Sequence, residues 1–295
     1  MGRAPAGPRL VSERVGEVCV DGSRLEFTEY GGGDRLVVLL HGQLMARRMH
    51  EPLARRLAAE GYRTVTLDLL GHGRSDRPAD PKRYSTAIFA RHVLALLDHL
   101  RADRAVIGGT SLGANVSLEV ALAAPERLVG MILEMPVLDN AVEAGIVTFG
   151  PLLFFGRITP WAVDAVRAVA QRVPRSWVPF WVGIGLDTLE QEPAPMAAAL
   201  HGVFFGRIAP SYDARKSIEV PAIVIGHPHD PVHPAADAAM LAEELPNVRF
   251  VAARSIVEWR RRPERITAEV LAFLDSAFAA EEPAETAPRR RRLRA

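Results

Sequence analysis

The sequence predicts an α/β protein built on a mainly parallel sheet with helices on its faces. Short apolar runs rich in β-branched residues alternate with longer amphipathic segments between residues 16 and 135, and the alternation resumes after residue 220. The runs are continuously apolar, as expected for strands that are buried on both faces. Strand, helix and strand at this spacing imply right-handed crossovers within one sheet.

The predicted elements follow in chain order. Asp21-Gly22 is a hairpin signal that joins the first two strands. Most later strands are apolar runs, and the helices lie between them. The predicted strands are Gly16–Val20, Leu25–Tyr30, Leu36–Leu40, Arg63–Asp68, Ala105–Gly108, Val129–Glu134, Ala222–Gly226 and Arg249–Ala252, and the predicted helices are Ala46–Glu60, Ser85–Leu100, Leu112–Ala124, Pro234–Glu244 and Pro263–Ala279.

The segment Val137–Glu219 breaks this alternation. It holds six of the 11 phenylalanines and three of the 4 tryptophans, is rich in proline, and has no strand pattern. We interpret it as a helical cap inserted into a core formed by residues 1–136 and 220–280. An aromatic excess above strand ends suggests an apolar pocket, which several of these rings would line. Residues 281–295 are polar and end in an arginine-rich stretch, which predicts a basic, disordered tail.

The composition narrows the classes of partner. Lys and Arg number 36 against 35 Asp and Glu, so the chain lacks the strong positive field of most nucleic-acid-binding proteins. The single cysteine, Cys19, cannot form an internal disulfide. The longest apolar run, Gly145–Gly156, is too short to span a bilayer. We therefore expect a cytoplasmic protein without integral membrane contact, whose partner is a small molecule; its oligomeric state stays open.

The motif that carries most chemistry is Gly109-Thr110-Ser111-Leu112-Gly113. It follows a predicted strand directly and opens a predicted helix, which is the context of a nucleophile elbow. Such a turn strains the serine backbone and leaves room only for glycine two residues before and after it. The Ser111 hydroxyl would then stand at a helix N-terminus, where the Leu112 amide can stabilise a developing negative charge.

Two further motifs precede the elbow. His41-Gly42 follows the third strand, and the amide of Gln43 in this loop is the second candidate donor to an oxyanion. Asp68–Asp76 (DLLGHGRSD) is a glycine-rich turn after the fourth strand. We interpret His41 and His72 as residues that shape these loops, and not as bases. No metal-ligand spacing and no phosphate-binding glycine motif occurs, so we expect no metal and no cofactor.

The three motifs together resemble the capped, esterase-like branch of the α/β-hydrolase fold family, from about Gly16 to Phe278. The resemblance implies an eight-stranded, mostly parallel sheet flanked by helices, with a helical cap. It also implies a catalytic triad of serine, acid and histidine in that chain order. The loop after Ala222–Gly226 looks like the family's acid loop, and Asp230 matches the triad carboxylate. Glu134 and Asp139 are the alternative acids.

The expected histidine is absent from its position in the family pattern. It should lie after the eighth strand, where counting gives Ile256 or Glu258. No histidine occurs after His233. Because serine needs a base to take its proton, we interpret this as a loss of the standard triad.

Several side chains could replace the missing base. Glu258 falls inside the vacant window, where burial and the nearby Asp230 charge would raise its pKa, and it is our first choice. His233 would have to fold back across the site from three residues beyond the acid. His227 and His229 flank the same loop, and we expect a local role for all three. The other candidates are His50 and, from the cap, His201.

Two function classes follow. The first is a serine hydrolase-like enzyme that acts on an apolar ester, thioester or related carbonyl compound with a non-standard triad. The second is a ligand-binding protein, because the family includes gibberellin receptors that lack the triad histidine and use the pocket to hold a ligand. The complete elbow favours the enzyme, and the residue at position 256 favours binding; the fold cannot decide between them.

Overall fold

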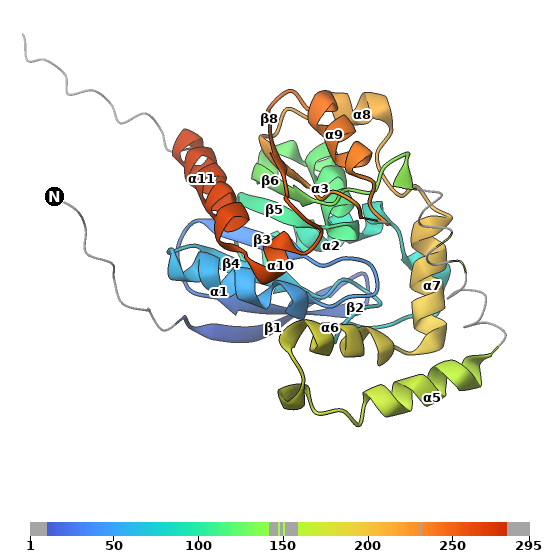
Figure 1. Ribbon diagram of the computed structural model, residues 1–295. Helices are drawn as coiled ribbons and strands as arrows, with labels where there is room; N and C mark the ends of the chain where they lie inside the picture. The colour runs from blue at the N-terminus through green and yellow to red at the C-terminus, as the bar shows by residue number, and fades with distance from the viewer. Residues whose placement is uncertain (1–10, 142–146, 148–149, 151–158, 231, 282–295) are drawn as a thin grey trace, which may run out of the picture.

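A computed structural model describes residues 11–141, 147, 150, 159–230 and 232–281 of the protein. Eight strands form one sheet in the order β1-β2-β4-β3-β5-β6-β7-β8 (Figure 1). The β1–β2 and β2–β4 pairs are antiparallel, and all other neighbours are parallel. The strands are β1 Glu13–Val20, β2 Ser23–Tyr30, β3 Leu36–Leu40, β4 Arg63–Leu67, β5 Ala105–Thr110, β6 Leu128–Glu134, β7 Ala222–Gly226 and β8 Val248–Ala252.

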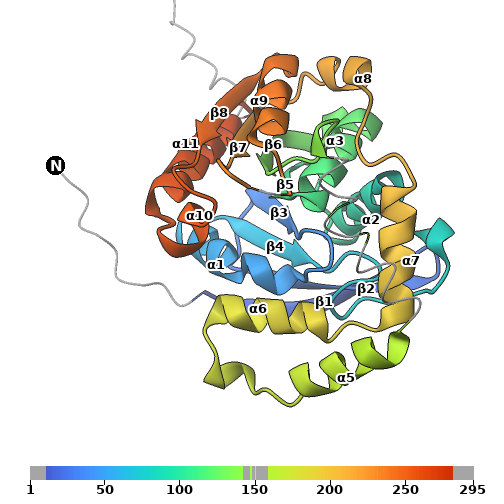
Figure 2. The same cartoon turned by 45° about the vertical axis from the view of Figure 1, so that its right-hand side comes forward.

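Helices connect the strands and pack on both faces of the sheet (Figures 1 and 2). The described α-helices are α1 Glu51–Ala59, α2 Thr86–His99, α3 Leu112–Ala123, α5 Pro160–Ala170, α6 Phe180–Leu189, α7 Pro193–Phe204, α8 Tyr212–Lys216, α9 Ala235–Glu244, α10 Glu258–Arg261 and α11 Glu264–Glu281. The described 3₁₀ turns are η1 Arg47–His50, η2 Pro81–Arg83, η3 Pro125–Arg127 and η4 Arg175–Trp177.

The continuous apolar runs are explained by two separate cores. Val38 and Leu40 of β3 pack with α2, α3 and α9 on one face. Val37 and Leu39, between them in sequence, pack with α1 and α11 on the other face. Successive side chains of a strand point to opposite faces, so a strand covered on both sides needs an apolar residue at every position.

The predicted order of strands and helices agrees with the observed one, and the first helix differs in detail. The sequence pattern predicts a helix over Ala46–Glu60, but a 3₁₀ turn comes first and α1 begins at Glu51. Pro52 is the second residue of α1. Proline lacks an amide hydrogen and disrupts the interior of a helix, while it is tolerated in the first turn. The regular helix therefore starts only just before Pro52.

The segment between β6 and β7 contains helices α5 to α8 and η4, and its described residues form no strand. Figure 2 shows α5 on the outside of α6, away from the sheet, and α7 beside the strand ends. The apolar run Gly145–Gly156 and the predicted basic tail fall almost entirely outside the described residues. Among the helices that the structure describes, none is both long and apolar enough to cross a membrane.

The carboxyl ends of four neighbouring parallel strands meet at one edge of the sheet. These ends are Leu40 of β3, Thr110 of β5, Glu134 of β6 and Gly226 of β7. Ligands of open α/β sheets bind at this edge, because the connecting loops there can carry side chains without disturbing the strands.

Candidate active site

Ser111 lies in the sharp turn between β5 and α3. Its backbone has φ 56° and ψ −112°, a conformation that costs energy for any residue except glycine. Its amide donates to the Glu134 carbonyl at 2.9 Å, which ties the turn to β6. A Cβ at Gly109 or at Gly113 would lie 2.2 Å from the Leu40 carbonyl oxygen. Only glycine therefore fits at both positions, as the nucleophile elbow predicts.

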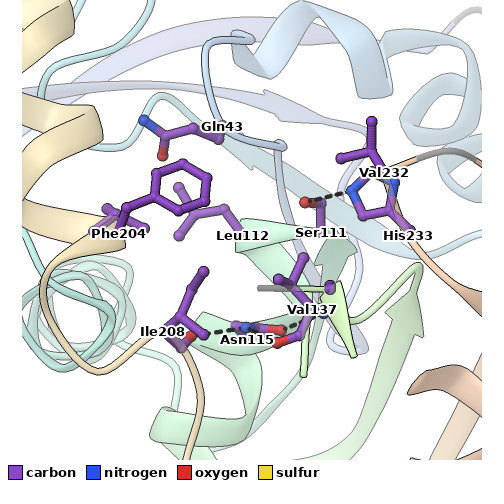
Figure 3. A pocket seen from close by; sticks show the side chains of 11 residues that line it. Gln43, Ser111, Leu112, Asn115, Val137, Phe204, Ile208, Val232 and His233 are labelled. Carbon is purple, nitrogen blue, oxygen red and sulfur yellow. Dashed lines mark hydrogen bonds between the residues drawn. The ribbon is translucent and has the colours of Figure 1, made fainter. Parts of the chain in front are cut away.

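The Ser111 hydroxyl faces an imidazole. Ser111 Oγ lies 2.9 Å from Nε2 of His233, and Nδ1 of the same ring lies 3.0 Å from Oδ2 of Asp230 (Figure 3). With Nδ1–H donating to the carboxylate, Nε2 is left as the acceptor for the serine proton. This is the arrangement of nucleophile, base and orienting acid that activates a serine.

The loop after β7 folds back so that its acid meets its own histidine. Oδ1 of Asp230 accepts the amide hydrogens of Val232, at 2.8 Å, and of His233, at 3.0 Å. Oδ2 remains for the imidazole. Burial would raise the pKa of Asp230, but hydrogen bonds from the His233 ring and from the two amides outweigh it and lower that pKa. The carboxylate is thus held ionised, with one oxygen shaping the turn and the other orienting the ring.

The structure differs here from the expectation that no histidine serves Ser111. The family pattern places the base after β8, and from the sequence we expect only a local role for His233. The position three residues after the acid reaches Ser111 because the Asp230 turn reverses the chain. Ile256, in the vacant window, is 37% exposed.

The other candidate bases have different partners. The Glu258 carboxylate accepts hydrogen bonds from Arg265, one of them 2.7 Å long, and from the Arg254 amide. The hydrogen bond from Arg265, against the opposing effect of burial, lowers the pKa of Glu258 to about 2. His50 contacts the Leu40 carbonyl at 2.9 Å, and His201 is exposed and packs against Phe205.

The two alternative acids, Glu134 and Asp139, also have other partners. Glu134 is buried, accepts hydrogen bonds from Thr110 and Arg260, and lies 3.1 Å from Nε2 of His227. Burial would raise the pKa of Glu134, but the Arg260 charge and the His227 ring hold it well below its usual range. Asp139 is largely exposed and pairs with Arg215 at 3.2 Å.

The loop after β3 lies against the elbow. A Cβ at Gly42 would be 3.7 Å from that of Ser111. Nδ1 of His41 donates to the Gly42 carbonyl at 2.8 Å, and Nε2 accepts the Leu69 amide hydrogen at 3.0 Å. Burial lowers the pKa of His41 and of His72, whose rings lie against each other at a tilt, to about 3. Both rings are therefore neutral at pH 7 and shape the two loops, in agreement with the sequence analysis.

A pocket of about 400 Å³, including its open mouth, leads to Ser111 and His233. Its remaining lining is mostly apolar and comes from both the core and the segment between β6 and β7 (Figure 3). The lining residues are Gln43, Ser111, Leu112, Asn115, Val137, Ala141, Val203, Phe204, Ile208, Val232 and His233. In the described part of the chain, no group of three His, Cys, Asp or Glu side chains could hold a metal ion.

The aromatic residues of the insertion contribute less to this pocket than the sequence predicted. Of those that the structure describes, only Phe204 lines it. Trp161 and Trp177 are 73% and 81% exposed, and Phe205 is 74% exposed. Phe149, Phe154 and Phe155 lie outside the described residues.

Comparisons with known proteins agree with this fold. A family model described as alpha/beta hydrolase fold matches residues 35–176. The chain is 32% identical over 111 residues to an epoxide hydrolase of Caballeronia sordidicola, which covers 38% of this chain and 33% of that protein. It is 26% identical over 232 residues to a RutD protein of Azorhizobium caulinodans, named for carbamate hydrolysis, which covers 76% of this chain and 84% of that protein.

A solved structure resembles most of the chain. The enol-lactonase from Burkholderia xenovorans LB400 matches with a TM-score of 0.71 at 22% identity, covering 88% of this chain and 100% of that structure. At this identity the likeness concerns the fold. The fold predicted from the sequence, an eight-stranded, mostly parallel sheet flanked by helices, is confirmed.

Proposed function

We propose that this member of the α/β-hydrolase fold family is a serine hydrolase that cleaves an ester, a thioester or a related carbonyl compound. The observation that carries the proposal is the hydrogen-bonded series from Ser111 through His233 to Asp230. An imidazole between a strained serine and a buried carboxylate is the arrangement that acyl transfer requires. The apolar lining of the pocket supports a substrate whose acyl or alcohol part is largely apolar.

The reaction has two halves. Ser111 Oγ attacks the substrate carbonyl while Nε2 of His233 takes the hydroxyl proton, and Asp230 stabilises the imidazolium that forms. The carbonyl oxygen becomes an oxyanion, to which the backbone amides of Gln43 and Leu112 donate. The imidazolium then gives its proton to the leaving group. Water, activated by the same imidazole, attacks the acyl-enzyme and releases the acid.

The proposal includes the segment Val137–Glu219 as a cap over this site. Val137, Val203 and Phe204 of that segment line the same pocket as Ser111. A cap that lines the pocket selects the substrate and limits bulk water around the reacting carbonyl, which strengthens the electrostatic interactions of the site.

The ligand-binding alternative has lost its main support. It was favoured by the absence of a base after β8, and His233 now stands within hydrogen-bond distance of Ser111. A protein that only held a ligand would not need an oriented imidazole at the serine.

The test combines a fluorophosphonate probe, which labels activated serines, with hydrolysis of short p-nitrophenyl esters. The wild-type protein should be labelled rapidly and should hydrolyse the esters, and Ser111→Ala should do neither. His233→Gln should lose about 10³-fold or more in rate, because the base is removed while its shape is retained. His99→Gln, the same change at an exposed position on α2, should leave both readouts intact.

Two results would refute this assignment. Rapid labelling of His233→Gln would mean that another residue is the base, and Glu258→Gln would then test the candidate that the sequence favoured. Absence of labelling and of turnover in the wild-type protein would instead return the ligand-binding alternative.

A further inference from the structure

Few polar side chains line the pocket at Ser111, and most of them already form hydrogen bonds within the protein. Ser111 and His233 form the proposed catalytic pair. The Asn115 carboxamide is fully engaged: its Nδ2 donates to the carbonyls of Val137 and Ile208, both at 2.7 Å, and its Oδ1 accepts the Val137 amide hydrogen at 3.1 Å. None of these three side chains is therefore free to form a hydrogen bond with a part of the substrate away from the reacting carbonyl.

Gln43 is different. Both polar atoms of its side chain, Nε2 and Oε1, are buried and have no hydrogen-bond partner among the residues that the structure describes. The side chain nevertheless lines the pocket, and Figure 3 shows its carboxamide next to the Phe204 ring, on the side of the view away from His233. Buried polar groups are nearly always hydrogen-bonded, because an unpaired one loses its contacts with water without replacement.

We propose that the Gln43 side chain recognises an uncharged hydrogen-bonding group on the substrate, such as a ketone, an amide or a hydroxyl. This inference rests on the proposed function and specifies its substrate class: an otherwise apolar carbonyl compound with a second, neutral polar group. A carboxamide offers both a donor and an acceptor to such a group. Among the residues that the structure describes, no Asp, Glu, Lys or Arg side chain lines the pocket, so a charged substituent would stay unpaired there.

The position of Gln43 in the chain suits this task. Its backbone amide is the proposed donor to the oxyanion, while its side chain extends into the pocket (Figure 3). The same residue would then hold the reacting carbonyl and the second polar group in a fixed relation. When the second polar group lies at the right distance from the reacting carbonyl, Gln43 binds the substrate and orients it for attack at the same time. This raises kcat/KM for that substrate only.

The experiment uses matched pairs of p-nitrophenyl esters. One member carries a ketone at the fourth, fifth or sixth carbon of the acyl chain, and the other carries a methyl branch at the same carbon. In the wild-type protein, kcat/KM for at least one ketone should exceed that of its methyl partner by about tenfold, the value of one well-made hydrogen bond. Gln43→Leu should bring this ratio to about one or below, since the backbone donor is unchanged and only the carboxamide is lost.

Gln171→Leu is the matched control. It makes the same change at an exposed residue outside the pocket and should keep the wild-type ratio. A ketone preference that survives in Gln43→Leu would overturn the inference, and so would equal rates for every pair in the wild-type protein. In either case hydrolysis itself would still support the proposed function.

Binding provides a readout that does not depend on turnover. Ser111→Ala cannot form the acyl-enzyme, so the Kd of each intact ester for this variant can be measured by calorimetry. The preferred ketone should bind about tenfold more tightly than its methyl partner, and Ser111→Ala with Gln43→Leu should bind both equally. If the wild-type protein hydrolyses no ester, the proposed function fails, and this Kd ratio still decides the role of Gln43.

Discussion

Replacing Arg260 by methionine tests how the buried charge of Glu134 is held. Arg260 donates a hydrogen bond of 2.6 Å to the Glu134 carboxylate, whose side chain is 1% exposed. The guanidinium also lies over the rings of Trp181 and Trp259, at 5.4 and 5.5 Å from their centroids. Removing one partner of a buried ion pair costs about 3–5 kcal/mol, because the other charge is left uncompensated. Methionine keeps much of the packing volume, so the loss of the positive charge should account for most of the change in stability.

The loss of stability in Arg260→Met should become smaller as the pH falls. In the wild-type protein the pKa of Glu134 lies well below its value in the unfolded chain, so its contribution to stability is present above about pH 4.3 and is lost below it. Burial is the largest single influence on the pKa of Glu134, and without Arg260 only the His227 ring opposes it, so this pKa should rise in the variant. The variant carboxyl then takes up a proton on acidification, which relieves the uncompensated charge. The stability difference between the two proteins should therefore shrink between pH 7 and pH 5.

Urea unfolding at the two pH values measures this difference. Arg260→Met should lower the free energy of unfolding at pH 7 by about 3–5 kcal/mol, a large part of the stability of an ordinary domain. Arg261→Met, the same change at the next and exposed residue of α10, should stay within about 0.5 kcal/mol of wild type. Equal stability of the two variants, or a loss that does not change with pH, would refute the reasoning.

Three further predictions follow from the site and the core. Gly113→Ala should abolish fluorophosphonate labelling and lower the melting temperature, because its Cβ would lie 2.2 Å from the Leu40 carbonyl oxygen; normal labelling would mean that the elbow can relax. Asp230→Asn should lower kcat by roughly 10⁴-fold in the ester assay with little change in KM, since the imidazole loses its orienting charge, and a mild effect would exclude Asp230 as the acid. Arg215→Met should cost about 3–5 kcal/mol in urea unfolding, because the buried Glu244 carboxylate loses its partner.

The parts of the fold that the sequence predicted are those set by local pattern. A strand buried on both faces is apolar at every position, so its run can be read directly, as in Leu36–Leu40. The elbow is equally local, since its two glycines and Ser111 are dictated by one turn against one carbonyl. The start of α1 was missed by a few residues because Pro52 was not given its weight as a first-turn residue.

The contact between His233 and Ser111 was missed because the position of His233 depends on how a loop reverses. The spacing of three residues between Asp230 and His233 was visible, but counting along a family pattern ignores turn geometry. The signal that could have found it is the aspartate itself, whose carboxylate can cap the amides two and three residues later and so curl the chain. Proline at 234 then directs the chain into α9, which begins at Ala235.

Glu134 contacts both the turn that carries Ser111 and the loop that carries His233, and these contacts help to explain how the two side chains meet. Ser111 follows β5 and His233 follows β7, and β6 separates these strands. Glu134 ends β6, accepts the hydroxyl hydrogen of Thr110 beside Ser111, and lies 3.1 Å from His227 at the start of the loop that carries Asp230. A single buried carboxylate thus contacts both segments. Because Asp230 and His233 belong to one turn, the relation between that turn and Ser111 is the only long-range alignment that the series of hydrogen bonds requires.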